Sequence, residues 1–382
     1  MFDVSVLAYN IKKHREMKKI SQKELAEKIF VSPQAISKWE RGLAVPEIDK
    51  LCLLAELLGS SLDALIGHIE ETETPMIGID GGGTKTEYIL FNERGTIFRR
   101  IIGEGTNPNF YGRDNVCEEL TSNIKVLLAI KPNTKGIFIG GAGFLTSKNG
   151  EYVKESLKKA FPMLKIRCKG DMINIIASAT DEEECLGSIS GTGNITFAYK
   201  SGEITKYGGY GTLFDVAGCG YTIGKEAISA ALKGSEGIGK ETLITKLVCE
   251  KVGGSILDHL QSIYRENASY IASFAKIVFE AMEQGDELAR EIIETNAKYV
   301  ADMINIAYEK NNKCKTVVLA GSLYKNEFFF ETVKRGLCNE LCVVTSDLPP
   351  VLGACVLACK LMEVDPKPIK ENFRAEYEKS II

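Results

Sequence analysis

Two patterns of hydrophobic spacing divide the chain. Over residues 1–67 the apolar residues recur at intervals of three and four, which is typical of amphipathic helices. These positions are Val6, Leu7, Ile11, Met17, Leu25, Ala26, Ile29, Ala35, Ile36, Trp39, Ile48, Leu51, Leu54, Ala55 and Leu58. From Met76 onwards, short apolar runs alternate with glycine-rich turns, which is typical of strands. The pattern therefore predicts an all-helical segment followed by a larger body that contains sheets.

Capping residues mark the ends of the predicted helices. Ser21 followed three residues later by Glu24 forms a capping box. Ser32 before Pro33 is a second helix start, with proline in the first helical position. A glycine ends that helix, and Pro46 begins the next one after a short loop. The segment is therefore expected to form five short helices in one compact bundle.

This helical segment resembles the Cro/repressor-type helix-turn-helix family. The matching stretches are ISQKELAEKIFVSPQAISKWERG at residues 20–42 and LAELLGSSLDALI after it. The resemblance implies that three side chains face base edges in the major groove: Gln34, Ser37 and Lys38. It implies that three others meet DNA phosphates: Gln22, Lys23 and Arg41. An amide can bond adenine in a bidentate way, and a lysine can donate to guanine. Trp39 is spaced to face the core of the bundle and not the DNA. The alternative to a DNA-binding segment is a helical bundle that binds another protein.

The distribution of charge favours double-stranded DNA as a partner. The net charge of the chain is −4, which by itself argues against a nucleic-acid binder. Between Asn10 and Arg41, however, nine lysines and arginines stand against four acidic residues. Residues 68–382 carry 37 basic and 42 acidic residues. Positive charge confined to one end is expected for a DNA-binding module carried on a neutral to acidic body.

After a polar, acidic segment that predicts a linker over residues 68–75, the body shows one arrangement twice. The strands MIGID and EYILF flank the turn GGGTKT and are followed by TIFRRII. Later, CLGSIS and ITFAY flank GTGN and are followed by ITKYGG. Further strands are expected at GIFIGGAG, KIRCKG and TVVLAGS, and helices at residues 114–130, 152–160 and in long stretches between 224 and 310. The predicted class is α/β with mixed sheets and a duplicated core, and not a simple doubly wound fold.

The two glycine turns are the segments of the body that are candidates for binding a phosphate group. Glycine lets the backbone approach a phosphate closely, and successive amide N–H groups form an anion cradle. Thr84, Lys85 and Thr192 add hydroxyl and ammonium donors. Neither turn is a P-loop or a dinucleotide-binding fingerprint. A single glycine turn is more often a plain hairpin, but two similar turns that each follow a strand favour a nucleotide site.

The body resembles the N-acetylglucosamine kinase and BadF-type ATPase family of the actin, hexokinase and Hsp70 superfamily. The matching segments run IDGGGTKTEYILF, TNPN, GDMINIIASA, SISGTGN, GGYG and VVLAGS, over nearly all of residues 76–360. The resemblance implies an actin-like ATPase body of two RNase-H-like domains with ATP and Mg²⁺ in the central cleft. The first would span residues 76–184 with a C-terminal helix at about 353–382, and the second residues 185–352.

The resemblance also assigns roles to individual residues. Asp80 matches the acidic residue that faces Mg²⁺, and Asp171 matches the catalytic base, which would also contact the sugar. The nucleotide contacts would be Gly82, Gly83, Thr84, Lys85, Gly191, Thr192, Gly193, Gly321 and Ser322. The sugar contacts would include Asn107, Gly209, Tyr210 and Gly211. The alternative for the two acids is structural, because Asp80 could cap a turn and Asp171 could begin the helix near Met172.

The chain departs from the family pattern where the sugar should be held. The family continues after its G-G-W-G segment with G-D-E-G, whereas this chain reads GGYGTLFDVAG. Val216 and Ala217 occupy the two acidic positions, and Asp215 stands one residue early. Tyr210 replaces the common tryptophan, and Asn194 replaces a serine in the second loop. Either Asp215 substitutes as a sugar contact after a local shift, or the substrate differs, or catalysis has given way to sensing.

These features favour a DNA-binding regulator, acting as a homodimer, whose ATPase-like body binds ATP and a sugar. The alternative is an active ATP-dependent amino-sugar kinase with an accessory DNA module. An ATP-driven reductase activator is a third interpretation, but the cysteines do not form its cluster-binding pattern. The apolar runs are too short to span a membrane, and no signal-peptide pattern is present, so the expected location is the cytoplasm.

The eleven cysteines contain no CxxC pair. Cys338 and Cys342, like Cys355 and Cys359, lie four residues apart, which would place each pair on one helix face. A four-cysteine iron–sulfur or zinc cluster is one interpretation of that spacing. Small buried side chains in a reducing compartment are the favoured one.

Overall fold

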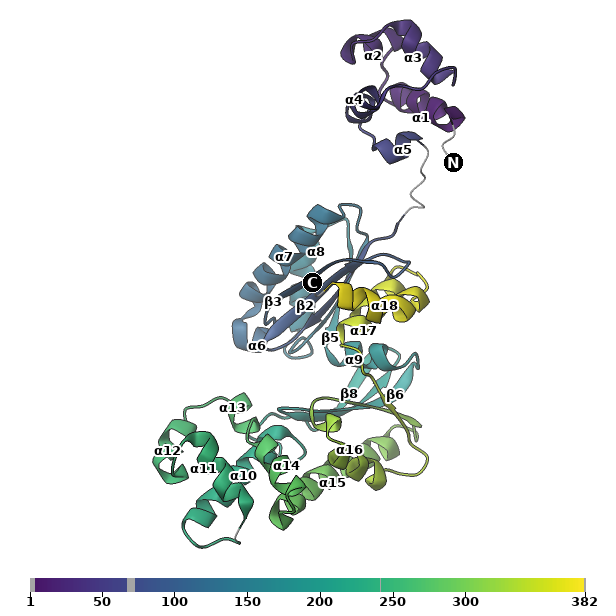
Figure 1. Cartoon of the computed structure of the whole chain (residues 1–382). Helices are drawn as coiled ribbons and strands as arrows, with labels where there is room; N and C mark the ends of the chain where they lie inside the picture. The colour runs from purple at the N-terminus through teal and green to yellow at the C-terminus, as the bar shows by residue number, and fades with distance from the viewer. Residues whose placement is uncertain (1–3, 67–72, 241, 381–382) are drawn as a thin grey trace. The chain divides into compact units, whose positions relative to one another are not determined.

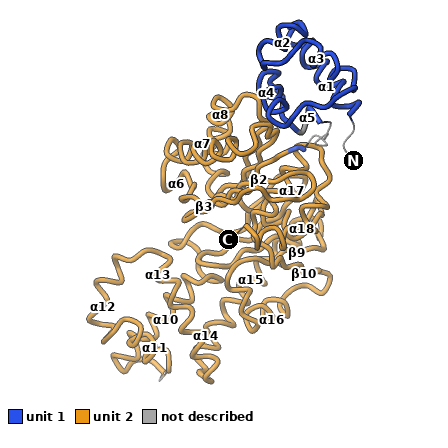
Figure 2. The backbone as a smooth tube through the Cα atoms, turned by 45° about the horizontal axis from the view of Figure 1, so that its top comes forward, with its two compact units in different colours: residues 1–74 blue, residues 75–382 orange. Residues whose placement is uncertain are grey.

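The computed structural model describes residues 4–66, 73–240 and 242–380. The chain divides into two compact units, Met1–Thr74 and Pro75–Ile382 (Figure 2). Most of the predicted linker, residues 68–72, lies outside the described residues. None of the described helices is long and apolar enough to cross a membrane.

Unit 1 contains the five predicted helices. They are α1 (Val4–Met17), α2 (Gln22–Lys28), α3 (Pro33–Glu40), α4 (Ile48–Leu58) and α5 (Leu62–Ile66). Their apolar faces meet in one core, in which Ile11, Leu25, Ile36 and Leu54 are fully buried and Trp39 is buried as predicted. The all-helical class expected for this segment is therefore confirmed.

The predicted caps are present, with one shift in a boundary. The Ser21 hydroxyl accepts a hydrogen bond from the Glu24 amide at 3.1 Å, and the Glu24 carboxylate accepts one from the Ser21 amide at 2.6 Å. The Ser32 hydroxyl caps α3 by accepting a hydrogen bond from the Ala35 amide at 3.2 Å, without a reciprocal bond. Helix α4, however, begins at Ile48 and not at the proline two residues earlier. The expected start was wrong because Glu47, the residue that caps α4, has an extended backbone.

Two apolar positions counted toward the core are exposed instead. Met17 is 70% exposed and Ile48 is 80% exposed. Met17 is the last residue of α1 and Ile48 the first residue of α4, so both lie at helix ends where the neighbouring helices do not cover them. Helical spacing alone does not show where a packed face stops.

A buried ion pair joins α3 to α1. Arg15 donates from Nε and Nη2 to the two carboxylate oxygens of Glu40, at 2.6 and 3.0 Å. The Glu40 side chain is only 2% exposed, and it also accepts a hydrogen bond from Gln22 of α2 at 2.7 Å. Because a bidentate, buried pair fixes both position and orientation, this network sets the packing of α3 on the other two helices.

We expect Glu40→Ala to destabilise α3, because it leaves the Arg15 guanidinium buried without its partner. The loss should be about 3 kcal/mol. Hydrogen exchange of the α3 amides in the full chain measures it as a lower protection free energy. The exposed Glu27→Ala on α2 is the control. Equal protection in both variants would contradict the structural role of the pair.

Unit 2 is built on two five-stranded mixed sheets with the same plan. The strand order in sheet A is β3-β2-β1-β4-β5, and in sheet B it is β10-β9-β6-β7-β8. In each sheet the first three strands along the chain pair antiparallel with one another in order, and the first of them also pairs parallel with the fourth strand, which pairs parallel with the fifth. The strands are β1 (Met76–Gly81), β2 (Lys85–Phe91), β3 (Ile97–Glu104), β4 (Gly136–Gly141), β5 (Lys165–Gly170), β6 (Glu184–Ser190), β7 (Asn194–Lys200), β8 (Glu203–Tyr207), β9 (Thr316–Ala320) and β10 (Cys342–Thr345). The duplicated α/β core is therefore confirmed.

Helices cover both faces of sheet A (Figure 1). They are α6 (Pro108–Tyr111), α7 (Arg113–Ile130), α8 (Asn149–Ala160), α9 (Met172–Ala179), α17 (Val351–Leu361) and α18 (Lys367–Lys379). Helices α7 and α8 pack on the face that carries Ile77 and Ile79. Helix α17 packs on the other face, against β1, β4 and α9. Because α9 also contacts β9 of sheet B, it links the two sheets.

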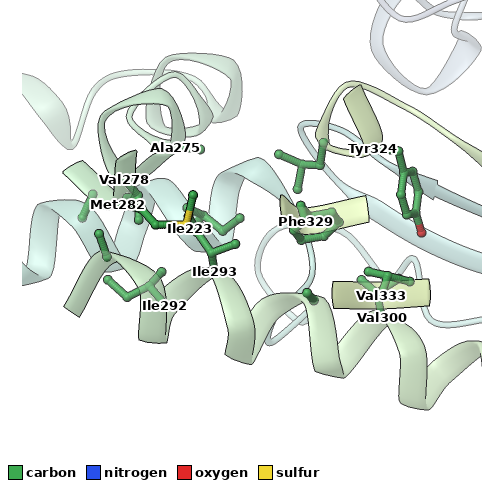
Figure 3. Packing of buried hydrophobic residues seen from close by; sticks show 14 of the residues in the cluster. Ile223, Ala275, Val278, Met282, Ile292, Ile293, Val300, Tyr324, Phe329 and Val333 are labelled. Atoms are coloured by element: carbon green, nitrogen blue, oxygen red, sulfur yellow. The ribbon is translucent and has the colours of Figure 1, made fainter. Parts of the chain in front are cut away.

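The largest core of unit 2 lies between sheet B and its helices. These are α10 (Gly220–Ser235), α11 (Leu243–Val252), α12 (Ile256–Ile263), α13 (Ala268–Ala272), α14 (Ala275–Glu283), α15 (Glu287–Lys310) and α16 (Glu327–Gly336), with a short 3-10 turn at Leu323–Lys325. Figure 3 shows Ile223, Val278 and Ile293 of α10, α14 and α15 packed together. The long helix α15 thereby supports both the sheet and the outer helices.

The sequence interpretation of one cysteine pair was wrong. Cys338 follows the end of α16 at Gly336, and Cys342 begins β10, so the two do not share a helix face. The chain leaves the helix at Leu337 with an extended backbone, which spacing alone could not reveal. Cys355 and Cys359 do lie on α17 and are buried in its core.

Candidate functional site

The ends of the parallel strands of sheet A bring two acidic residues to one edge. Gly81, Gly141 and Gly170 are in register across β1, β4 and β5. Asp80 precedes the first of these glycines, and Asp171 follows the last. Both carboxylates therefore lie at the carboxyl edge of the sheet, where ligands bind in open α/β sheets.

The first glycine turn closes on itself beside Asp80. The Gly82 amide donates to the Lys85 carbonyl at 2.9 Å, and the Gly82 carbonyl accepts from the Thr106 amide at 3.0 Å. Gly83 is half-buried, and Thr84 is exposed together with Lys85. The turn thus presents backbone and side-chain donors at its tip, as an anion cradle requires.

Asp80 is held by a buried amide. Asn174 of α9 donates from Nδ2 to the Asp80 carboxylate at 2.6 Å. Burial raises the pKa of Asp80 to about 7, an effect opposed by the Asn174 hydrogen bond and reinforced by the charge of Asp171. The two acids are therefore close enough to interact electrostatically. Sequence reasoning missed Asn174, although it stands within the matched segment GDMINIIASA.

Asp171 caps α9, as the structural alternative expected. Its Oδ1 accepts a hydrogen bond from the Met172 amide at 3.1 Å. Burial raises the pKa of Asp171, and the charge of Lys206 on β8 opposes that rise. A helix cap and a proton acceptor are compatible roles, because the cap engages one carboxylate oxygen. Lys206 is a further residue of this region that sequence reasoning did not identify.

The second glycine turn is tied to the start of α10. The Gly220 amide donates to the Gly191 carbonyl at 2.7 Å, and the Tyr221 amide donates to the Thr192 carbonyl at 3.0 Å. Thr192 and Gly193 are exposed, and no atom lies within 4 Å of where a Gly193 Cβ would be. The tip of this turn is therefore open to a ligand.

A hollow of about 490 Å³ opens beside the second turn. Its lining includes Gly191, Thr192 and Ser322, three of the predicted nucleotide contacts, together with Lys276 and Phe279 of α14. Gly321, the residue before Ser322, has φ +111°, and a Cβ at this position would lie 2.3 Å from the Ser190 carbonyl oxygen. Only glycine therefore fits at position 321, and it lets the chain pass close behind the turn.

The predicted sugar contacts divide between the two sheets. Asn107 is buried beside sheet A, where its side-chain oxygen caps α6 by accepting from the Asn109 amide at 3.0 Å. Gly209, Tyr210 and Gly211 lie on the loop after β8 of sheet B. In that loop, Gly209 and Gly211 have φ values of +71° and +95°, and the Tyr210 side chain is exposed.

Asp215 is engaged within its own loop. Its two carboxylate oxygens accept hydrogen bonds from the Tyr210 and Gly211 amides, each at 3.0 Å. The side chains around it are apolar and largely exposed: Tyr210, Leu213, Phe214 and Val216. The loop after β8 therefore presents an apolar surface that includes Val216, one of the two positions at which the resemblance implies an acid, whereas Ala217 at the other position is buried.

The end of this loop is anchored by buried amides. Asn194 donates to the Ala217 carbonyl at 3.0 Å, and the Gly218 amide donates to Asn296 of α15 at 2.7 Å. Ser190 donates to the Gly218 carbonyl. Asn194 thus holds the end of this loop through a main-chain carbonyl, a contact that a comparison of motifs does not show.

The residues predicted to contact DNA lie on α2, α3 and the residue after α3. Gln34 and Lys38 are exposed on α3, Ser37 is half-buried, and Arg41 is exposed and donates to the Ser37 carbonyl at 3.1 Å. Lys23 is exposed on α2. Gln22 is half-buried, and its amide donates to Glu40.

Two units of different class make up this chain: a helix-turn-helix domain and a body with the actin-like ATPase fold. Residues 77–358 match the BadF/BadG/BcrA/BcrD ATPase family, and the chain belongs to that family. Residues 11–65 match a helix-turn-helix family. Both resemblances stated from the sequence are confirmed.

Named relatives are similar to the second unit. An N-acetylmuramic acid/N-acetylglucosamine kinase of Clostridium acetobutylicum is 27% identical over 282 residues, which is 69% of this chain and 90% of the relative. A structure from Chromobacterium violaceum, solved as a candidate N-acetylglucosamine kinase, has a TM-score of 0.59 at 19% identity over 75% of this chain and 99% of its own. A ROK-family transcriptional regulator, a homologue of the E. coli MLC protein, has a TM-score of 0.53 at 13% identity over 96% of this chain and 99% of its own. These structures support the fold.

We expect Asp80→Asn to stabilise the metal-free protein increasingly as the pH rises. The pKa of Asp80, about 7 in the folded chain, lies above the ordinary value of an aspartate, so folding favours the protonated carboxyl. The charge of Asp80 therefore costs stability that grows between about pH 4 and pH 7. Thermal unfolding in EDTA at pH 5 and pH 8 measures the difference, with the exposed Asp258→Asn as control. A gain in thermal stability that is the same at pH 5 and pH 8 would contradict the raised pKa of Asp80.

Proposed function

We propose that the protein is a DNA-binding transcriptional regulator whose ATPase unit binds ATP with Mg²⁺ and a sugar. The observation that carries the proposal is the presence in one chain of a helix-turn-helix domain and an ATPase-family body. A homodimer would place two copies of α3 on half-sites about one helical turn of DNA apart. The ligand state of the body would then control the affinity for the operator.

Nucleotide binding would use both glycine turns. The phosphates would contact Gly82, Gly83, Thr84 and Lys85 of the first turn and Gly191, Thr192 and Gly193 of the second. The nucleoside would occupy the hollow of about 490 Å³ next to Gly321 and Ser322, a volume in the usual range for small-molecule pockets. The two tips carry the exposed donors that phosphate oxygens need.

The Asp80 carboxylate fits a Mg²⁺ ion bound together with the nucleotide. Mg²⁺ prefers oxygen ligands and keeps several waters, so one or two carboxylates and the phosphates suffice to hold it. A cation also offsets the cost of charging Asp80, which burial makes unfavourable. When bound, the ion would neutralise charge on the phosphates.

An amino sugar is the ligand class that the similarity to the Clostridium acetobutylicum kinase favours. Asn107, Asp171 and the Gly209–Gly211 segment would contribute contacts. Asp215 would act through the loop, because its carboxylate already accepts two backbone amides. The apolar surface of that loop would then change which substituents on the sugar are accepted.

Phosphoryl transfer to a sugar hydroxyl is the second candidate function. Asp171 favours it, because burial raises the pKa of this carboxyl and makes it a better proton acceptor. In that reaction Asp171 would take the proton of the attacking hydroxyl, and the two glycine turns would hold the transferred group.

We expect Gln34→Ala and Lys38→Ala each to weaken specific DNA binding by about 10- to 100-fold, the loss typical of one base contact. Binding to operator fragments selected from a random duplex library, followed by fluorescence anisotropy at fixed salt, measures this loss. The control is Lys12→Ala, which removes an exposed charge from α1. Equal affinities for all variants would overturn the assignment of α3 as the recognition helix.

A coupled assay of ADP release across hexoses and hexosamines tests the second candidate. If the chain is a kinase, Asp171→Asn should lower kcat by about 10²- to 10⁴-fold, because the proton acceptor is lost. Asp258→Asn, an exposed acid on α12, should leave kcat unchanged. If the protein binds these sugars but releases no ADP with any of them, the kinase function is ruled out and the regulator that senses its ligand stands.

A further inference from the structure

Asn174 is fully buried, and its amide is directed at the acidic edge of sheet A. Its Nδ2 lies 2.6 Å from the Asp80 Oδ1. The same nitrogen lies 3.3 Å from the Gly140 carbonyl oxygen and 3.5 Å from that of Ile79. The contact with Asp80 is therefore the shortest of three, and it joins α9 to the end of β1.

The orientation of this amide follows from its partners. A carboxylate oxygen and two carbonyl oxygens surround the nitrogen, and all three are acceptors. Rotating the amide by 180° would set its oxygen against three other oxygens, so the nitrogen has to face Asp80. Asn174 thus acts as a fixed donor to one oxygen of the carboxylate.

Two glycines keep the space that this arrangement needs. A Cβ at Gly140, the residue paired with Asp80 across β1 and β4, would lie 2.2 Å from the Asn174 Oδ1. A Cβ at Gly353 of α17 would lie 1.8 Å from the Asn174 carbonyl oxygen. Any side chain at either position would force Asn174 to move.

The oxygen atom of the Asn174 amide makes no hydrogen bond, among the described residues, that would offset its burial. The Asn174 Oδ1 is buried and has no hydrogen-bond partner among the described residues. A buried acceptor without a partner is unfavourable for folding, and an apolar residue of the same size would avoid that cost. The arrangement is thus better explained by what the nitrogen does to Asp80 than by stability.

We infer that Asn174 is a positioning residue that holds the Asp80 carboxylate for Mg²⁺ bound with the nucleotide. The inference rests on the proposed role of Asp80. By occupying Oδ1, Asn174 restricts rotation of the carboxylate and would leave Oδ2 for the metal or its water. Side chains that orient a metal-binding group in this way typically contribute 10- to 100-fold to metal affinity.

The test compares nucleotide affinity with and without Mg²⁺. Calorimetry of the full chain with a non-hydrolysable ATP analogue gives one dissociation constant in EDTA and another in Mg²⁺. The ratio of the constant in EDTA to the constant in Mg²⁺ reports how much the metal contributes to affinity. Asn174→Ala removes the donor, and Asn174→Leu removes it while conserving volume. We expect both to reduce the ratio by about 10-fold or more and to leave the affinity in EDTA within about twofold of the wild type.

Asn92→Ala is the matched control, because it also removes a buried asparagine. Asn92 caps the turn between β2 and β3, accepting from the Arg94 and Thr96 amides at 3.1 and 3.0 Å, and lies outside the predicted ligand contacts. It should destabilise the fold but keep the wild-type ratio. Thermal unfolding of every variant establishes that each is folded.

The outcomes separate this inference from the proposed function. No effect of Mg²⁺ on the wild-type affinity would overturn the metal role of Asp80 and the role of Asn174 with it. A wild-type effect that both Asn174 variants retain would overturn the role of Asn174 alone. If Asn92→Ala loses the Mg²⁺ effect on nucleotide affinity to the same extent, or if neither Asn174 variant folds, Asn174 serves general stability. Either result would also overturn the positioning role of Asn174.

Discussion

The parallel pairing of β1, β4 and β5 is the constraint on which the proposed site depends. Parallel strands end at the same edge, so Asp80 and Asp171, which stand 91 positions apart in the chain, both lie at one edge of sheet A. Sheet B repeats the plan and presents the second turn at the end of β6. Helix α9 contacts both sheets and carries Asp171 and Asn174. Its position therefore links the first turn to sheet B.

The sequence was informative where local chemistry decides the structure. The capping box of Ser21 and Glu24 and the repeated strand–turn–strand pattern depend on neighbouring residues, and both are present. Asn174 and the Arg15–Glu40 pair depend on contacts between distant segments, which hydrophobic spacing does not encode. The short strand β10 was missed for the same reason, because it is defined by its pairing with β9. The roles of the predicted site residues remain predictions.

The loop after β8 distinguishes this chain from the family pattern. Asp215 stabilises the loop through two backbone amides, and Asn194 holds its end through the Ala217 carbonyl. The apolar side chains of this loop, Tyr210, Leu213, Phe214 and Val216, are largely exposed. The glycine turns keep the features needed to hold phosphates. Predicted phosphate contacts that match the family pattern, together with predicted sugar contacts that depart from it, are the reason we propose a protein in which ligand binding carries a signal.

If ligands of the ATPase unit change the affinity for DNA, thermodynamic linkage makes the operator affinity depend on those ligands. The measurement is the dissociation constant of the full chain for its selected operator, alone and with saturating Mg²⁺, ATP analogue and amino sugars. We expect the dissociation constant to change by about 5- to 150-fold for at least one combination, the usual range of allosteric coupling. An operator affinity that stays the same in every combination, with ligand binding verified by calorimetry, would contradict this expectation.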